Sequence, residues 1–517
     1  MRLQHFHTES DMRFLKYIFL LLSLAALFSC SSSGTGELTV LAGSELKDIE
    51  PLLPDIEKET GVRLKLSYVG SLEGAEKIIA GDPSDAAWFS HGKYLTLLEG
   101  ASPRIKAQEK IMLSPVILGV KEGAAQAWGW IAKPPSWRDI AEKARTGELR
   151  FAITNPASSN SGFTALIAIT AAFANKADAI TEADIKNEAI TDFFRGQRLT
   201  AGSSGWLAGE FVKQQDRLNG IFNYESVLMQ LNSAGELKEK LALIYPAEGV
   251  VSADYPFILL NEAKREAYRK VADYLRTPAV QARLMSETKR RPAIPQVKLD
   301  AAFSDRLIVE LPFPGRKEVV DAILFAYLDE HRRPAHVYFV LDVSGSMEGE
   351  RIRELRVAMD NLAGRDTSLT GQFARFASRE KITLIPFSTD VQPVADFEVK
   401  NAAGREQTFA QLRNFVERLQ AHGNTAIYSA VQKAYELAAA AQKTEKDRVF
   451  SIVLMTDGEY NTGVTPDQFK RFLQSLPPEV RAIKTFPILF GDAALSEMNA
   501  LAQATGGSVF DGRKSLS

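Results

Sequence analysis

The chain has 517 residues, of which 45% are hydrophobic and 24% are charged. This composition is that of a globular protein and excludes a disordered or collagen-like chain. Lys and Arg total 62 and Asp and Glu total 64, so the charge balance gives no reason to expect nucleic acid as a partner. Cys30 is the one cysteine, which excludes an intrachain disulfide and a zinc site built from thiolates.

The first thirty residues have the pattern of an export signal. Arg13 and Lys16 precede the apolar stretch 17–28, which is shorter than the roughly 20 residues of a membrane-spanning helix. Met12 serves as a start as well as Met1, because the first eleven residues add nothing to this pattern. We therefore predict that these thirty residues are a signal peptide.

Cys30 stands at the end of this signal. It follows Leu27, Phe28 and Ser29, an order that resembles the lipobox of bacterial lipoproteins, although Phe28 replaces the usual smaller residue. The resemblance implies acylation of the Cys30 thiol, and so an exported protein lipid-anchored to a bacterial membrane, in the periplasm or at the cell surface. Residues 31–37, rich in Ser and Gly, then form a flexible tether. The alternative is an ordinary cysteine in a cleaved or uncleaved signal anchor.

Two long blocks follow the tether, and both predict an α/β fold. Residues 38–312 and 334–517 alternate strand-like apolar runs with helical patterns, which indicates parallel sheets with helices on their faces. Residues 313–333 form a linker and a helix between the blocks, because two prolines and a glycine stand together in 310–317. We therefore predict one α/β domain from each block.

Oxygen-bearing side chains stand at the ends of two predicted strands in the second block. Strand 337–341 leads into Asp-Val-Ser-Gly-Ser, and strand 449–455 leads into Thr-Asp-Gly; a Gly-Asn-Thr loop lies between them in the sequence. Open α/β sheets place ligand sites at such strand ends, and hard oxygen donors suit Mg²⁺ or Mn²⁺. The candidate metal ligands are Asp342, Ser344, Ser346, Thr425 and Asp457.

This set resembles the metal-ion-dependent adhesion site of von Willebrand factor type A domains, which have a Rossmann-like fold. The resemblance implies that Ser344, Ser346 and Thr425 bind the cation directly, and that Asp342 and Asp457 act through water or hydrogen bonds. It also implies Mg²⁺ (or Mn²⁺ or Ca²⁺) as the ion, and a protein partner whose carboxylate fills an open coordination position. The alternative is that the serines cap a helix and the aspartates only end strands.

The second block is expected to hold three further strands, at 382–387, 485–490 and 508–510. The sequence ends at Ser517, before the final helix that the resemblance implies. The helical pattern at 319–328 is a candidate to cover the sheet face left open, and a truncated reading frame is the alternative.

In the first block, several strands end in Ser- or Gly-rich turns before helices. Residues 38–44, 62–71 and 151–162 have this pattern, and residues 242–256 and 281–292 are two further characteristic segments. In this order they resemble type 2 periplasmic solute-binding proteins, which implies two lobes that close on a ligand. Hydroxyls and the N–H groups of helix N-termini favour anions. The candidate ligand-binding residues are Ser44, Ser71, Ser161, Gly162 and Tyr245.

The alternative for these serines is simple N-capping, in a domain that has lost binding and serves as a spacer. An enzyme is not expected, because the chain has no HExxH, GxSxG or GxxxxGK[ST] motif. We predict a membrane-anchored, extracytoplasmic binding protein. Its second domain binds a protein partner through a divalent cation, and its first domain binds an unidentified small molecule or anion, or acts as a scaffold. The alternative is the substrate-binding component of a transport system, with an oxyanion as one candidate solute.

Overall fold

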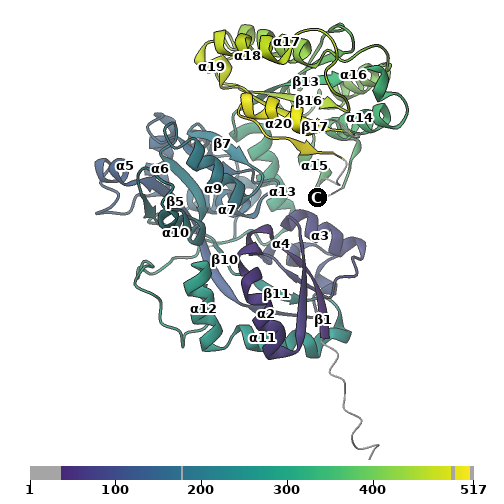
Figure 1. The fold of residues 1–517 in the computed structure, drawn as a ribbon. Coiled ribbons are helices and arrows are strands. Elements are labelled where there is room, and N and C mark those ends of the chain that lie inside the picture. Colours follow the sequence, from purple (N-terminus) through teal and green to yellow (C-terminus); the bar gives the residue numbers. More distant parts are fainter. Residues whose placement is uncertain (1–35, 176–178, 369, 491–494, 513–517) are drawn as a thin grey trace, which may run out of the picture.

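The computed structural model describes residues 36–175, 179–368, 370–490 and 495–512. The predicted signal peptide, Cys30 and most of the tether lie outside these residues. Within them the chain forms three sheets with helices packed around each, so the predicted α/β fold is confirmed. Figure 1 shows the last part of the chain above two lobes built by the first part. None of the helices in the described segments combines the length and the apolar character needed to cross a membrane.

The first sheet belongs to one lobe of the first domain, with strand order β2-β1-β3-β11-β4. β1 pairs in parallel with β2 and β3, and β11 runs antiparallel to β3 and β4. The strands are β1 Gly36–Ala42, β2 Val62–Tyr68, β3 Ala86–Trp88, β4 Ala107–Lys110 and β11 Pro256–Leu259. The helices are η1 Ser44–Leu52, α2 Leu53–Thr60, α3 Ser71–Ala80, α4 Lys93–Leu97, η2 Ser102–Arg104, η4 Glu262–Lys264, α11 Arg265–Leu275 and α12 Pro278–Thr288. β1 therefore includes Gly36 and Glu37, which the sequence assigns to the tether.

The second sheet belongs to the other lobe, with strand order β10-β5-β8-β6-β7 and with β9 and β12 also paired to β5. The strands are β5 Met112–Lys121, β6 Phe151–Thr154, β7 Gln197–Ala201, β8 Gly220–Tyr224, β9 Leu241–Ile244, β10 Ser252–Ala253 and β12 Arg291–Pro292. The helices are α5 Glu122–Ala127, α6 Trp137–Arg145, α7 Asn160–Ala174, η3 Glu182–Asp184, α8 Glu188–Phe194, α9 Ser204–Lys213 and α10 Glu225–Ala234. α7 carries no charged residue, and it is buried from Asn160 to Ala172 because it is apolar on all sides.

The two lobes are joined where β4 passes into β5, where β10 passes into β11 and where α12 passes into β12. The Tyr224 hydroxyl of β8 lies 3.1 Å from the Ser90 hydroxyl that follows β3, which ties the lobes together beside these crossings. One continuous apolar cluster includes buried side chains from both lobes. The first domain is therefore two-lobed, with its lobes in contact.

The connecting segment packs on the first domain. α13 (Lys317–Ala326) and the π-helical turn η5 (Tyr327–His331) follow the predicted linker. The apolar side of α13, including Val320 and Leu324, is buried in the cluster that joins the two lobes. The segment predicted to cover the open face of the last sheet packs instead on the lobes, because its apolar side matches their shared core.

The third sheet forms the C-terminal domain, with strand order β15-β14-β13-β16-β17-β18. All neighbours are parallel except β14 and β15. The strands are β13 Ala335–Asp342, β14 Lys381–Phe387, β15 Ala395–Glu398, β16 Val449–Thr456, β17 Lys484–Leu489 and β18 Phe510–Asp511. The helices are η6 Gly345–Met347, α14 Glu350–Asp360, η7 Asn361–Arg365, α15 Gly371–Ala374, α16 Arg405–Glu417, α17 Ile427–Ala441, α18 Pro466–Ser475, α19 Pro478–Arg481 and α20 Leu495–Ala504.

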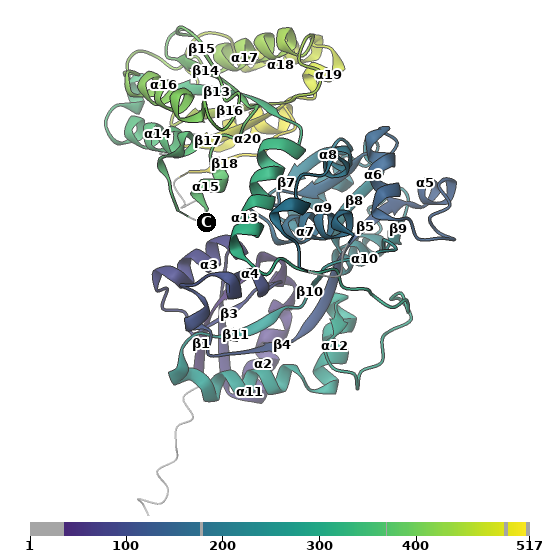
Figure 2. The same ribbon diagram turned by 180° about the vertical axis from the view of Figure 1, so that it is seen from behind.

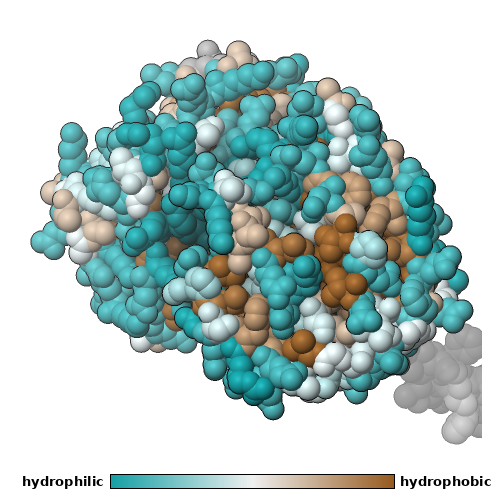
Figure 3. Space-filling view, turned by 90° about the horizontal axis from the view of Figure 1, so that it is seen from above, coloured by the Kyte–Doolittle hydropathy of each residue, from teal (hydrophilic) through white to brown (hydrophobic). Residues whose placement is uncertain are grey.

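Helices cover both faces of this third sheet. α14 and α16 contribute to the apolar cluster on one face, and α17, α18 and α20 contribute to the cluster on the other. β13 and β16 lie side by side in the middle of the sheet, so their carboxyl ends meet at one edge. The face seen from above in Figure 3 is mostly hydrophilic, with hydrophobic residues gathered in its middle and right-hand parts.

Candidate functional site

The five predicted metal ligands gather at the carboxyl ends of β13 and β16. Asp342 ends β13 and is fully buried. Its Oδ1 accepts the Ser344 N–H at 2.8 Å, and its Oδ2 accepts the Thr456 hydroxyl at 2.5 Å. Burial raises the pKa of the Asp342 carboxyl to about 6, against the opposing effect of the hydrogen bonds from Ser344 and Thr456, and the nearby Asp457 charge adds a smaller rise. Two hydrogen bonds thus fix this carboxylate below the loop.

The hydroxyls lie above this carboxylate. Ser344 Oγ lies 3.1 Å from Ser346 Oγ, and the Ser346 hydroxyl donates to Asp457 Oδ1 at 2.9 Å. A Cβ atom built on Gly458 would lie 3.4 Å from Ser346 Oγ and 3.7 Å from Thr425 Oγ1, so these two hydroxyls face the same small space. The structure therefore brings together all five residues, although 115 positions separate the first from the last in the sequence.

Backbone hydrogen bonds hold the loops that carry these residues. The Gly345 N–H donates to the Gly423 carbonyl at 3.0 Å, and the His422 N–H donates to the Val343 carbonyl at 2.8 Å. Gly423 has a φ of +76°, a conformation that a side chain would strain. The loop before α17 is thereby held against the loop after β13, which brings Thr425 to the site.

Two residues that the sequence analysis did not select complete the surroundings. Asn461 Oδ1 accepts the Thr425 N–H at 2.8 Å, and the Asn461 N–H donates to the Thr425 carbonyl at 3.1 Å. Arg351, in the first turn of α14, forms an ion pair with Asp457 and donates to the Ser346 carbonyl at 3.2 Å. Asn461 follows the Thr-Asp-Gly sequence at the end of β16 closely, so its place near the site could have been predicted from the sequence. The contact of Arg351 could not, because it depends on the direction of α14 relative to the loop after β13.

The donor set suits a hard divalent cation. Two carboxylates and three hydroxyls supply only oxygen, as Mg²⁺, Mn²⁺ and Ca²⁺ prefer. The described residues contain no group of three or more His, Cys, Asp or Glu side chains placed to hold a metal, and this edge supplies two carboxylates. The residues at this edge therefore fit the cation that the sequence implies, as a site built mainly from hydroxyls.

A second candidate site is the cleft between the two lobes, with a volume of about 520 Å³. Predicted residue Ser44 lines it, and so do Ser158 and Ser159 before α7 and Ser203 and Ser204 at the start of α9. Ser71 lines a much smaller hollow of about 10 Å³ beside it, where its hydroxyl has no hydrogen-bond partner. The cleft is therefore rich in hydroxyls from both lobes.

The other three predicted ligand-binding residues do not line this cleft. The Ser161 hydroxyl is buried between the hydroxyls of Thr154 at 2.9 Å and Ser204 at 2.8 Å. A Cβ atom on Gly162 would lie 2.3 Å from the Thr154 carbonyl oxygen, so this glycine allows α7 to approach β6 closely. The Tyr245 hydroxyl donates to the buried Glu225 carboxylate, which also pairs with Arg291 at 2.7 Å.

The charges in the cleft are mixed. The half-buried Glu45 carboxylate folds back toward Gly43 and accepts the Asn160 side-chain amide at 3.4 Å. Lys47 also lines the cleft, and its ammonium lies 5.2 Å from the centre of the Tyr68 ring. A carboxylate beside the N-terminus of η1 occupies a position that an anionic ligand would otherwise favour.

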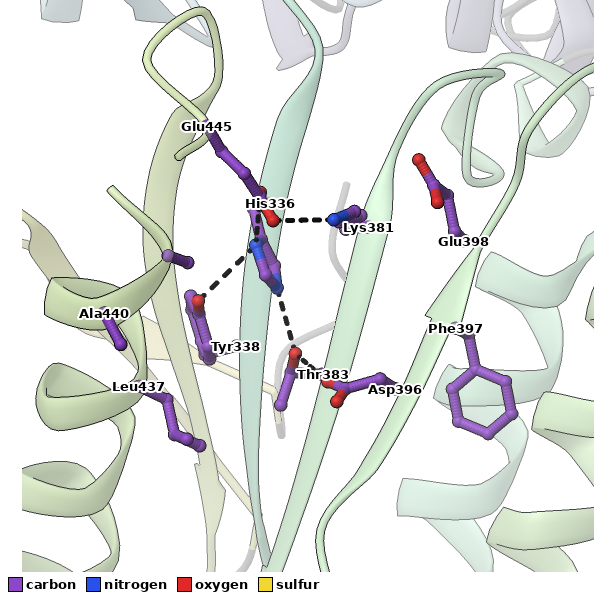
Figure 4. Close-up of a pocket in the computed structure, with 11 residues that line it drawn as sticks. His336, Tyr338, Lys381, Thr383, Asp396, Phe397, Glu398, Leu437, Ala440 and Glu445 are labelled. Atoms are coloured by element: carbon purple, nitrogen blue, oxygen red, sulfur yellow. Dashed lines mark hydrogen bonds and ion pairs between the residues drawn. The ribbon is translucent and has the colours of Figure 1, made fainter. Parts of the chain in front are cut away.

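A third hollow, of about 420 Å³, lies at the opposite end of the C-terminal sheet from the five clustered residues (Figure 4). His336 Nε2 lies 2.9 Å from the Thr383 hydroxyl, and His336 Nδ1 lies 3.0 Å from Glu445. Lys381 pairs with the same glutamate at 2.6 Å, and Thr383 donates to Asp396 at 2.5 Å. Burial lowers the pKa of His336, and the network links its imidazole at the start of β13 to the first residues of β14.

Comparison with known proteins agrees with this division of the chain. Residues 38–287 match the family described as "Bacterial extracellular solute-binding protein", and residues 336–515 match the "von Willebrand factor type A domain". The chain is a solute-binding-protein domain followed by a von Willebrand factor type A (VWA) domain. The first family indicates a non-catalytic binding protein and an extracytoplasmic location.

The curated relatives match between 25% and 35% of this chain. Inter-alpha-trypsin inhibitor heavy chain H4 of Bos taurus is 26% identical over 192 residues, which are 35% of this chain and 19% of that protein. Uncharacterized protein sll0103 of Synechocystis is 30% identical over 171 residues, which are 32% of this chain and 36% of that protein. This chain thus spans less than two fifths of the length of either relative.

The similar solved structures cover somewhat more than half of this chain. The sulfate-binding protein SubI from Mycobacterium tuberculosis is 18% identical, with a TM-score of 0.41 and coverage of 55% of this chain and 98% of that chain. The periplasmic binding protein AfuA from Actinobacillus pleuropneumoniae, with fructose-6-phosphate bound, is 14% identical, with a TM-score of 0.44 and coverage of 57% and 98%.

Proposed function

We propose that this protein is an extracytoplasmic binding protein that captures a protein partner through a divalent cation held by the VWA domain. Its solute-binding domain takes a small polar ligand in the interlobe cleft. The observation that carries the proposal is the meeting of three hydroxyls and two carboxylates at the ends of β13 and β16. Mg²⁺ is the ion of choice, with Mn²⁺ or Ca²⁺ as substitutes.

The chemistry of the residues explains why the partner would be acidic. Ser344, Ser346 and Thr425 are neutral donors, and Asp342 is engaged in two hydrogen bonds below them. A cation held in this way keeps much of its positive charge, which favours a carboxylate supplied from outside. Ser346 is exposed, so the side of the site away from β13 is open to such a group.

Export and anchoring form part of the proposal. The signal peptide and Cys30 would place the protein on the outer side of a bacterial membrane through a lipid, with residues 31–37 as a tether. We expect Cys30→Ser to release the protein from the membrane fraction. Continued retention of that variant would indicate an uncleaved helix instead.

A role in solute transport is the second candidate, and the two-lobed cleft favours it. A binding protein of this architecture would deliver its ligand to a permease, with the VWA domain as a docking module. Thermal-shift measurements against oxyanions, sugars and amines test this second candidate, because a transport component must bind one such solute. A chain that binds none of them is not a transport component, whereas solute binding alone is compatible with both candidates.

Calorimetric titration with Mg²⁺ tests the main proposal. The Cys30→Ser chain should bind one Mg²⁺, and Asp342→Ala should weaken binding by at least about tenfold, as loss of an orienting group commonly does. Asp447→Ala is the matched control, because Asp447 is an exposed carboxylate just before β16, at the opposite end of the sheet. If Asp342→Ala binds Mg²⁺ like the control, the cation is not held at these strand ends.

A further inference from the structure

The VWA domain supplies part of the wall of the solute cleft. Thr370, Phe373 and Ala374, which follow α14 and η7, line the same 520 Å³ cavity as Ser44 and Ser159 of the two lobes. The Thr370 hydroxyl donates to Glu76 on α3 at 2.8 Å. These groups are about 300 residues apart in the sequence, so the contact exists only in the assembled chain.

Phe373 anchors this wall. Its ring is 5% exposed and belongs to the apolar cluster of the two lobes rather than to either cluster of the VWA domain. The ring centre lies 5.0 Å from that of Phe325 on α13. The ring of Phe373 is thus buried in the core of another domain, which is typical of an ordered interface because exposing an aromatic ring to water is unfavourable.

The VWA domain also contacts the other lobe. Lys484 at the start of β17 pairs at 3.1 Å with Glu210 on α9, and that glutamate is itself buried. The Trp206 ring of α9 lies 6.1 Å from the Phe510 ring of β18. α9 begins at Ser204, on the wall of the cleft. The VWA domain therefore bears on both lobes, on either side of the cavity.

The connecting segment holds the same arrangement. Asp321 on α13 accepts the Tyr94 hydroxyl of the first lobe at 3.4 Å, and the Tyr327 hydroxyl accepts the Gln197 amide of the second lobe at 3.3 Å. Figures 1 and 2 show α13 standing between the VWA domain and the lobes, and α15 above α3. The two lobes are thus bound to each other by the segment that leads into the VWA domain.

From these contacts we infer that the VWA domain is a cover of the solute cleft, and that Thr370 and Phe373 complete its ligand site. Two-lobed binding proteins open by rotation of one lobe against the other. A domain fixed to both lobes must release one of them when they separate. Docking of the VWA domain and access to the cleft are therefore linked, and each must shift the equilibrium of the other. The inference rests on the proposed function only in naming the cleft as a ligand site.

Thiol labelling tests this cover without any ligand. Cys30 is the one cysteine of the sequence, so the Cys30→Ser chain has no thiol. Adding Ser159→Cys to it places a single thiol on the cleft wall, at a position where the serine side chain makes no capping hydrogen bond. Ser286→Cys places one on the exposed side of α12 as the control. The rate of modification by a polyethylene-glycol maleimide then reports access to each position.

The cover is weakened in two ways. Phe373→Ala removes the anchor, and Lys484→Glu sets a like charge against Glu210 without opening a cavity in the core. Each substitution should raise the labelling rate of Ser159→Cys by at least about tenfold and leave the rate of Ser286→Cys unchanged. A tenfold change corresponds to a coupling free energy of about 1.4 kcal/mol between docking of the VWA domain and access to the cleft. Adding Glu210→Lys to Lys484→Glu restores opposite charges between the VWA domain and α9 and should slow labelling again; the like charge that it sets against Lys213 lies within α9.

Phe469→Ala is the control for general loss of VWA stability, because that ring is buried in the domain's own core. Equal labelling of Ser159→Cys in the parent, in Lys484→Glu and in the charge-swapped chain would overturn the inference. The inference would also be overturned if Phe469→Ala increased the labelling rate of Ser159→Cys as much as Phe373→Ala does, with both chains still folded by circular dichroism. A failed ligand screen would count against the proposed function and against Thr370 and Phe373 as ligand-site residues, but not against the cover, whereas unchanged labelling would refute the cover even in a chain that binds solute.

Discussion

The Arg351 guanidinium and the Asp457 carboxylate form an ion pair beside the candidate cation site. Asp457 is buried, whereas the Arg351 side chain is about one third exposed at the start of α14. The same guanidinium donates to the Ser346 carbonyl. Asp457 would therefore interact both with the Arg351 guanidinium and with the proposed cation. These two positive charges would lie close together and repel each other.

Arg351→Ala should therefore strengthen cation binding. We expect Mg²⁺ to bind up to about fivefold more tightly, since a partly exposed ion pair contributes at most about 1 kcal/mol. Calorimetric titration at fixed ionic strength measures the change. Arg353→Ala, an exposed arginine on the same helix, is the control. Weaker Mg²⁺ binding by Arg351→Ala than by this control would show that Arg351 supports the site instead of competing for Asp457.

Asn461 is expected to position Thr425 rather than to touch the cation. Its side-chain oxygen holds the Thr425 N–H, so Asn461→Ala frees the loop before α17. We expect Mg²⁺ affinity to fall by about tenfold, the usual cost of losing a group that orients a ligand. Asn424→Ala, on the loop before α17, should leave the affinity unchanged, because Asn424 bonds to Thr389 through its backbone N–H. Equal affinities in the two variants would mean that the loop keeps its shape without Asn461.

The buried His91 makes stability depend on pH. Burial first, and then the charges of Lys93 and Lys110, lower the pKa of His91 from 6.5 to about 3. The unfolded chain therefore takes up a proton at a higher pH than the folded chain. The stabilising effect of the neutral imidazole is complete above about pH 6.5 and is lost as the pH falls toward 3.

Denaturant unfolding at several pH values measures this effect. Between pH 6.5 and 4.5 we expect the free energy of unfolding to fall by about 2 to 3 kcal/mol more in the parent than in His91→Asn, at 1.36 kcal/mol per pH unit. Asparagine keeps an acceptor for the Lys93 N–H, which His91 Nδ1 accepts at 3.1 Å. Parallel pH profiles for the two chains would show that His91 is not the group responsible.

The sequence predicted the parts of the fold that depend on local pattern. The strands expected at 382–387 and 485–490 are confirmed as β14 Lys381–Phe387 and β17 Lys484–Leu489. Asp342 and Asp457 follow buried apolar runs, and parallel neighbours end at the same edge of a sheet, so their meeting was predictable. The Ser-rich turns of the first block also marked two of the cleft-lining regions, around Ser44 and Ser159.

Contacts between distant segments were not predictable in this way. The apolar side of α13 could pack equally well on the C-terminal sheet or on the two lobes. Its hydrophobic pattern alone therefore did not show which of them it covers. Phe373 stands in a short segment with no periodicity, and its place in the core of the first domain depends on how the domains dock. Ser161 and Gly162 have the composition of a ligand loop, yet their positions are set by close packing of α7 on β6.

A substitution at Gly162 tests whether this glycine is needed for packing of α7 on β6 or for ligand binding. A Cβ atom there would lie 2.3 Å from the Thr154 carbonyl oxygen, a backbone atom that cannot move aside cheaply. Gly162→Ala should therefore destabilise the protein by about 1 to 3 kcal/mol, as overpacking does. Gly209→Ala is the matched control within α9, because nothing lies within 4 Å of its added methyl group, and it should stabilise by about 0.5 to 1 kcal/mol. Denaturant midpoints measure both changes. A Gly162→Ala chain as stable as the parent would mean that α7 can shift away from β6, and would return Gly162 to the candidate ligand-binding residues.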